Sequence, residues 1–232
     1  MSESGVDRYL GHSIAINAHI AEVLANLLNR ANVLSIPLFA GWAETLVGTG
    51  TTYESLAKLT LESGTTANSS AKLTNNIPCL NTGNLNFGRL DWDKKLYLIF
   101  QVLRYNSVAT GISRVQLKDV QTLANLGAKG IGLYIDNLAL YGESYGTARA
   151  TVNLGVTLTS ARHNLILIVH DPSVPKIEWY VNGVLKGTQS TADNIPSGAA
   201  ADDVSLVFSV ENGATAANTR MDLASIWIWQ AR

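Results

Sequence analysis

The chain has one cysteine, no long hydrophobic run and few charges. Because Cys79 is alone, no intrachain disulfide can form, and the fold must depend on its hydrophobic core. Its neighbours Ile77, Pro78 and Leu80 predict a buried, unreactive thiol. No window holds the ~20 consecutive apolar residues of a membrane span, so no membrane partner is expected.

Charged residues make up only 15% of the sequence, and the formal net charge is −1. Without a basic patch, nothing in the composition supports binding to nucleic acid or to an anionic membrane surface. The N-terminus does not have the pattern of a secretory signal, because Glu3, Asp7 and Arg8 precede any apolar stretch. We therefore expect a protein that is made in the cytoplasm without a signal peptide.

Several motifs that would support catalysis are missing. The sequence contains no phosphate-binding glycine loop and no serine-nucleophile elbow. His163 and His170 are seven residues apart, which places them on opposite faces of a regular strand. They are therefore not expected to bind a metal ion together.

No cofactor is expected, and calcium is the one alternative considered. Calcium prefers oxygen ligands, which the carboxylates and carbonyls of loops commonly supply. The pairs Asp202-Asp203 and Asp136-Asn137 offer such oxygens. Pairs of this kind are usually turn formers, so they are weak candidates for a calcium site.

The most informative stretch that is present spans residues 176–188, Lys-Ile-Glu-Trp-Tyr-Val-Asn-Gly-Val-Leu-Lys-Gly-Thr. Two apolar-rich segments flank Asn182-Gly183, the dipeptide that most readily forms a two-residue type I′ turn. The stretch therefore predicts a tight β-hairpin.

Strand patterns recur from residue 35 to the C-terminus. Residues 95–104 and 163–170 are nearly continuously apolar, which is typical of central, buried strands. Short connections of Gly, Asn, Asp and Ser separate about a dozen such segments, enough for two packed antiparallel sheets. We predict an all-β sandwich over residues 35–232.

The first part of the chain has a different periodicity. Between Ser13 and Asn32 apolar residues recur at spacings of three and four, as on one face of an amphipathic helix. A helix this short is marginal alone in water, so its apolar face needs a cover. Two covers are open: the sandwich itself, or other molecules in a bundle or larger assembly. We predict that residues 1–34 form an arm for anchoring or oligomerisation, with these interface residues: Ile16, Ile20, Val23, Leu24 and Leu27.

The last strand carries apolar residues on both faces. Trp227 and Trp229 share one face, while Ala224, Ile226 and Ile228 share the other. One set must face the core between the sheets, and the other set needs a different cover.

The first strand of the hairpin also carries large apolar side chains on both faces. Ile177, Trp179 and Val181 alternate with Glu178 and Tyr180, and Glu178 is expected to face solvent. Three different groups could pack on the aromatic residues that lie outside the core: a stacked sugar ring, the N-terminal helix or a neighbouring subunit.

Three aromatic residues are therefore candidates for contact with a glycan or with a neighbouring subunit. The candidates are Trp227, Trp229 and Tyr180.

From residue 129 to the C-terminus, the order of these elements resembles the concanavalin A-like (laminin G-like) jelly roll. The resemblance rests on residues 129–135 (Lys-Gly-Ile-Gly-Leu-Tyr-Ile), the apolar residues 165–169, the hairpin residues 179–183 (Trp-Tyr-Val-Asn-Gly) and the closing residues 221–229. It implies an antiparallel two-sheet jelly-roll sandwich. The helix before residue 34 is not part of the family pattern.

Glycosidases of the related laminarinase type carry Glu-x-Asp-x-x-Glu on one strand. This sequence departs from that pattern, because Tyr180 and Gly183 follow Glu178 where Asp and Glu would be required. Glycoside hydrolysis needs two carboxyl groups on one face, so we predict a protein that is not an enzyme.

The chain is also similar to jelly-roll modules of tailed-phage particles, in which a helix or arm precedes a sandwich. This similarity implies a structural or attachment protein of the virion, such as a capsid decoration, fibre or tail protein. The expected partners are other virion proteins, further copies of the chain (a trimer being one form) and host surface glycans. Two alternatives stay open: a carbohydrate-binding module or lectin, and a degenerate glycoside hydrolase of the laminarinase type.

Overall fold

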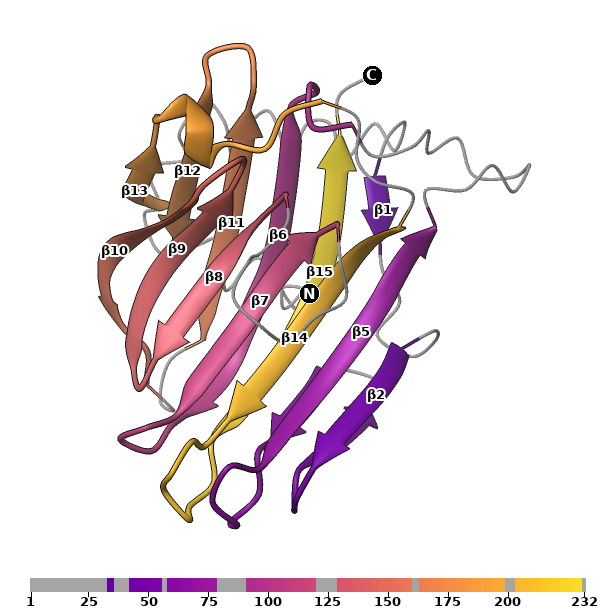
Figure 1. The fold of residues 1–232 in the computed structure, drawn as a ribbon, viewed down its shortest axis with the longest axis vertical. Coiled ribbons are helices and arrows are strands. Elements are labelled where there is room, and N and C mark those ends of the chain that lie inside the picture. The colour runs from indigo at the N-terminus through magenta and orange to yellow at the C-terminus, as the bar shows by residue number, and fades with distance from the viewer. Residues whose placement is uncertain are drawn as a thin grey trace, which may run out of the picture.

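The computed structural model describes residues 33–35, 42–55, 58–78, 91–119, 129–159, 163–198 and 203–230. These residues form two antiparallel β-sheets that pack as two layers (Figure 1). The one helix within these ranges is a single 3-10 turn, η1 (Ala192–Asn194), so no described helix could cross a membrane. The predicted all-β sandwich is confirmed, whereas the predicted helix over residues 13–32 lies outside the described residues.

Sheet A contains eight strands. Seven of them follow one another in the order β13 (Val184–Gln189), β12 (Lys176–Val181), β11 (Asn164–Asp171), β6 (Leu96–Asn106), β15 (Arg220–Gln230), β4 (Lys58–Glu62) and β3 (Thr51–Ser55). The eighth, β1 (Val33–Ser35), pairs with residues 227–229 of β15. The predicted boundary between arm and sandwich, after residue 34, therefore falls inside a strand that is hydrogen-bonded to sheet A.

Sheet B contains seven strands. Their order is β10 (Arg149–Thr157), β9 (Ala139–Tyr145), β8 (Gly130–Asp136), β7 (Ile112–Lys118), β14 (Asp203–Glu211), β5 (Ser70–Pro78) and β2 (Trp42–Val47). All the pairings in both sheets are antiparallel, and neighbours such as β14 and β5 are far apart in the sequence. Such crossovers are characteristic of Greek-key wiring.

The predicted hairpin is confirmed. Strands β12 and β13 flank Asn182 and Gly183, whose φ angles of 52° and 79° are both positive, as a type I′ turn requires. The side chains of Ile177, Trp179 and Val181 are buried between the two sheets. The alternation along this strand therefore predicted the inward face correctly.

Glu178 corrects one expectation, because it is buried and does not face solvent. It lies on the outer face of sheet A, and the residues two before and two after it share that face. Lys176 Nζ lies 2.9 Å from Glu178 Oε1, and the Tyr180 hydroxyl donates a hydrogen bond of 2.9 Å to Oε2. These two side chains bind both carboxylate oxygens.

The last strand changes its inward face partway along. Met221 and Leu223 are in the core near its start, whereas Ile226 and Ile228 are in the core near its end. A register shift against β6 between Ala224 and Trp227 accounts for this change. Such a bulge inserts one residue and turns the following side chains to the opposite face.

Candidate functional site

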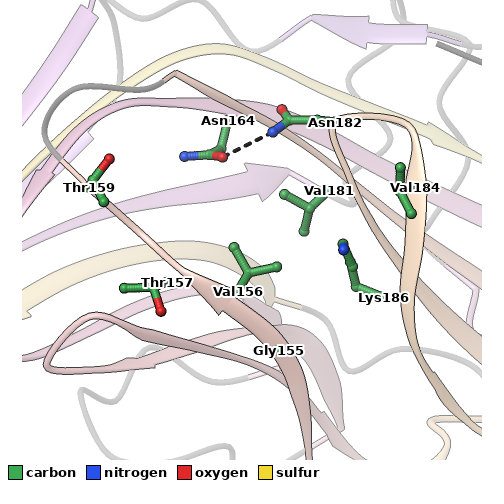
Figure 2. Close-up of a pocket in the computed structure, with 9 residues that line it drawn as sticks. All are labelled: Gly155, Val156, Thr157, Thr159, Asn164, Val181, Asn182, Val184 and Lys186. Carbon is green, nitrogen blue, oxygen red and sulfur yellow. Dashed lines mark hydrogen bonds between the residues drawn. The ribbon is translucent and has the colours of Figure 1, made fainter.

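A pocket of about 420 Å³ lies where the edge strands of the two sheets meet (Figure 2). One wall comes from β10 and the residues after it, and the opposite wall comes from the β12–β13 hairpin and the start of β11. We call it the edge pocket. Its lining residues are Gly155, Val156, Thr157, Thr159, Asn164, Val181, Asn182, Val184 and Lys186.

A β-bulge shapes the β10 wall. The pairing of β10 with β9 shifts register between Asn153 and Val156. Within the bulge, the Gly155 amide donates a hydrogen bond of 2.8 Å to Asn153 Oδ1, and Gly155 has a φ of +61°. Such a conformation favours glycine, and a Cβ at this position would have no atom within 4 Å. The bulge lets Val156 pack against the core and leaves open space beside it.

The hairpin wall is held by Asn182. Its amide donates to the Leu165 carbonyl oxygen at 2.8 Å, and its Oδ1 accepts from the Leu165 amide at 2.9 Å. Its Nδ2 donates to Asn164 Oδ1 at 3.1 Å, the bond drawn in Figure 2. Three hydrogen bonds to the first two residues of β11 therefore hold the type I′ turn in place, and with it this side of the pocket.

The lining of the edge pocket is divided into an apolar and a polar part. Val156 and Val181 lie at its centre, with Val184 beside them, while Thr157 and Thr159 lie on the β10 side (Figure 2). On the opposite side Lys186 contributes an ammonium group that forms no ion pair with any other described residue. None of the nine lining residues is Asp or Glu.

A second group of functional side chains lies on the outer face of sheet B. Gln116, Lys118 and Glu143 are fully buried there, with exposed fractions of 0%. Gln116 Nε2 donates a hydrogen bond of 2.7 Å to Glu143 Oε2, and Arg149 Nε donates one of 2.7 Å to Oε1. We call this group, together with Arg114, the sheet B polar cluster.

Glycine makes this cluster possible. Gly132 lies between Gln116 and Glu143 in the pairing register of β7, β8 and β9. A Cβ at Gly132 would overlap the Val115 carbonyl oxygen and lie 2.9 Å from Gln116 Cα, so no larger residue fits. The bond between Gln116 and Glu143 therefore crosses a strand that has no side chain in its way.

The charges of the cluster are largely paired. Arg114 NH1 lies 2.6 Å from Glu211 Oε1, and its guanidinium is 5.5 Å from the centre of the Tyr134 ring. Burial lowers the pKa of Lys118 to about 8, while the nearby carboxylate of Glu143 opposes that shift. Both oxygens of Glu143 are occupied by donors, so the cluster is organised as a structural network.

The outer face of sheet A carries the three aromatic residues predicted as contacts. Tyr180 and Trp229 are buried and Trp227 is half-buried. The rings of Trp229 and Tyr97 are 4.5 Å apart. We call this surface the sheet A aromatic face, and its members are Tyr97, Ile99, Leu165, Leu167, Val169, Tyr180, Trp227 and Trp229.

The two histidines of β11 and its approach lie apart, and the predicted interface residues lie outside the described ranges. His170 is buried in the core, where its Nε2 lies 3.0 Å from the Pro196 carbonyl oxygen, and His163 is exposed. Burial lowers the pKa of His170. The predicted interface residues Ile16, Ile20, Val23, Leu24 and Leu27 belong to the ranges that the structure does not describe.

Of the two candidate calcium-binding pairs, Asp136-Asn137 lies at a turn and Asp203 begins strand β14. Asn137, with a φ of 54°, lies in the tight connection between β8 and β9, next to Asp136. Asp202 lies outside the described residues. Within the described ranges, no three His, Cys, Asp or Glu side chains are grouped so that they could hold a metal ion.

No protein-family model and no curated protein sequence matches the chain, but solved structures do. A Bacillus licheniformis β-glucanase is similar with a TM-score of 0.53 and 14% identity, over 88% of this chain and 99% of that chain. A Crh5 transglycosylase in complex with NAG is similar with a TM-score of 0.56 and 12% identity, over 87% of this chain and 85% of the other. This chain has the concanavalin A-like jelly-roll fold.

A third similar structure is the binding domain of botulinum neurotoxin DC in complex with SialylT. The TM-score is 0.53 and the identity 12%, over 87% of this chain and 48% of that chain. The concanavalin A-like sandwich therefore spans about half of the neurotoxin domain's length. At these identities the likeness concerns the fold, and the pocket and clusters above are features of this chain.

Sequence reasoning missed the edge pocket of this concanavalin A-like sandwich. Thr157, Thr159 and Lys186 are common surface residue types with no motif around them. The one available signal was Gly155 in the middle of a strand pattern, because an isolated glycine there suggests a bulge. Gly155 therefore predicts a bulge at this position, but it does not predict which hairpin packs opposite the bulge.

Proposed function

We propose that the chain is a saccharide-binding module without catalytic activity, and that the edge pocket holds one or two sugar rings. The observation that carries this proposal is the divided lining of the pocket. Val156 and Val184 offer apolar contact to the C–H face of a sugar, while hydroxyl, amide and ammonium groups surround them. A volume of about 420 Å³ lies within the ~300–1,000 Å³ of small-molecule sites.

The similar structures support this ligand class. The Crh5 transglycosylase is in complex with NAG, and the neurotoxin binding domain is in complex with SialylT. In this chain Lys186 has no anionic partner among the described residues, so an acidic sugar is favoured over a neutral one. A carboxylate accepting a bond from this ammonium group would gain more than a neutral hydroxyl does.

The same lining supports binding without hydrolysis. Glycosidases use two carboxyl groups about 5–10 Å apart on either side of the scissile bond. The edge pocket is lined by no carboxylate, and on sheet B both oxygens of Glu143 accept hydrogen bonds from Gln116 and Arg149. A saccharide in the edge pocket would therefore meet no acid and no base.

Filling the pocket should abolish saccharide binding. Val184 is 54% exposed and lines the pocket, so a Val184→Trp variant should fold and occupy the space with an indole. Leu185 is the next residue, is 46% exposed and does not line the pocket, so Leu185→Trp is the matched control. The full chain would be screened on an array of neutral and sialylated saccharides, and the best binder titrated by calorimetry. Absence of binding to every saccharide, or undiminished binding by Val184→Trp, would reject the proposal.

Removing the charge should weaken binding of an acidic sugar selectively. We expect Lys186→Gln to lower affinity for a sialylated saccharide about threefold to tenfold, because a charge-assisted hydrogen bond at an exposed site contributes ~0.5–1.5 kcal/mol. Lys94→Gln is the control, since Lys94 is exposed and precedes β6 at the end of sheet A away from Asn164. If Lys186→Gln and Lys94→Gln bound the sialylated saccharide with the same affinity, a role for Lys186 would be contradicted.

We further propose that this module serves a larger particle as an attachment component, with a tailed-phage virion as the specific case. The support is the combination of a lectin-like sandwich with a preceding amphipathic segment, a combination similar to virion modules. Capsid or tail genes beside the coding gene, and detection of the chain in purified particles by antibody labelling, are the expected results. A gene neighbourhood of secreted carbohydrate-degrading enzymes would instead favour a carbohydrate-binding module.

A further inference from the structure

The sheet A aromatic face is a continuous apolar surface over four neighbouring strands. In the pairing register, Tyr180, Leu167, Ile99 and Trp227 form one row across β12, β11, β6 and β15. Val169, Tyr97 and Trp229 form a second row beside it. Because same-row residues in adjacent strands point to the same side, these side chains make one surface.

This surface is covered, although it lies on the outside of the sandwich. Tyr97, Ile99, Leu167, Val169, Tyr180 and Trp229 are only 0 to 9% exposed. Sheet B packs on the opposite, inner face of sheet A, and the described strands form two layers with no third layer. An uncovered apolar patch of this size would be unusual on a monomeric protein.

Strand β1 lies next to this face. Val33 pairs with Trp229, and Ser35 pairs with Trp227. The amphipathic stretch ends at Asn32, so it joins sheet A directly at the edge of the aromatic rows. No linker separates the two, and a tether this short gives an intramolecular contact a high effective concentration.

We propose that residues 13–32 of the same chain are the cover of the sheet A aromatic face. Their apolar stripe, which includes Ile20, Leu24 and Leu27, matches the apolar rows. A helix of this length would be ~30 Å long, whereas four neighbouring strands span ~14 Å between the outer two. One helix of this length would therefore be long enough to cross the face. Its polar side, with Asn17 and Asn26, would then face solvent. The segment is then a built-in third layer and not a free anchor.

Thiol labelling of the full chain tests this cover without removing it. Leu24→Cys places a thiol on the apolar stripe, and Asn26→Cys places a matched thiol on the polar side. With the reactivity of Cys79 subtracted, we expect maleimide to label the first at least about tenfold more slowly than the second, because reaction requires local opening. Both should label equally fast in urea. Equal rates in the folded chain would overturn the proposal.

Two further measurements identify what provides the protection. Trp227→Ala should speed labelling of the Leu24→Cys thiol about fivefold or more, since it removes part of the face that the segment covers. Tyr53→Ala, at an exposed tyrosine of β3 outside the face, should not. The protection should also be independent of protein concentration. Protection that is lost on dilution would assign the cover to a second copy, and insensitivity to Trp227→Ala would place the segment elsewhere; either result rejects the proposal.

Discussion

Replacing Trp179 by alanine should destabilise the fold by about 3–5 kcal/mol, as large-to-small substitutions of buried aromatic residues do. Trp179 is fully buried between the two sheets, and its Nε1 donates a hydrogen bond of 3.0 Å to the Gly132 carbonyl oxygen. Its ring also packs on Gly142, where a Cβ would approach within 2.5 Å of the ring atoms. The alanine variant would leave a cavity and lose this hydrogen bond at the same place. Urea denaturation measures the change in unfolding free energy.

Trp179→Phe separates the two contributions. Phenylalanine keeps most of the apolar contact with Gly142 but cannot donate the hydrogen bond, so a loss of about 1–2 kcal/mol is expected. If Trp179→Ala lost no more than the phenylalanine variant, the packing of the ring would not be the main contribution. The expected order is wild type, then phenylalanine, then alanine.

The hairpin that contains Trp179 could be predicted because all its signals are local. Asn182-Gly183 selects the turn, the turn fixes the register, and the alternation then decides which side chains face inward. The same logic was less complete in β15. There the alternation placed Ala224 on the same face as Ile226 and Ile228. The two isoleucines do share the core, but a bulge between Ala224 and Trp227 puts Ala224 on the other face, and no residue type in that stretch indicates a bulge.

The sheet B polar cluster could not be predicted, because it depends on which strands become neighbours. Gln116 and Glu143 are 27 residues apart and lie on strands separated by β8. Each alone is an ordinary polar residue in a strand, where a solvent-facing position is the usual expectation. Glu178 is a different case, because its partners Lys176 and Tyr180 are two residues away on the same strand. Alternation alone predicted a solvent-facing carboxylate there and did not predict this pairing.

The edge pocket depends on two strand ends that the sequence does not relate. The bulge at Gly155 and the turn at Asn182 belong to the edges of different sheets, and only the packing of those sheets brings them together. Periodicity describes one strand at a time, so it predicts faces but not the contacts between edges.

Lys118 should make the stability of the protein rise with pH. It is fully buried, and burial lowers its pKa from 10.5 to about 8 in the folded chain. Between these values the unfolded chain keeps a proton that the folded chain has lost, so the unfolding free energy increases as pH rises. At ~1.4 kcal/mol per pKa unit, the difference between the folded and unfolded pKa values corresponds to about 3 kcal/mol of unfolding free energy. This stabilisation is complete above pH 10.5 and is lost as pH falls through about 8.

Lys118→Met removes the titrating group while keeping an unbranched side chain of similar length. We expect the variant to be more stable than the wild type by about 1–3 kcal/mol at pH 7, where the wild type must bury the charge. Its advantage should shrink toward pH 10.5, because the neutral lysine no longer carries that penalty. Lys94→Met is the control, since Lys94 is exposed and is not among the charged groups that shift the pKa of Lys118. Urea denaturation from pH 7 to 10.5 measures how the unfolding free energy of each protein changes with pH. If Lys118→Met showed the same change with pH as the wild type, another group would be responsible for the pH dependence.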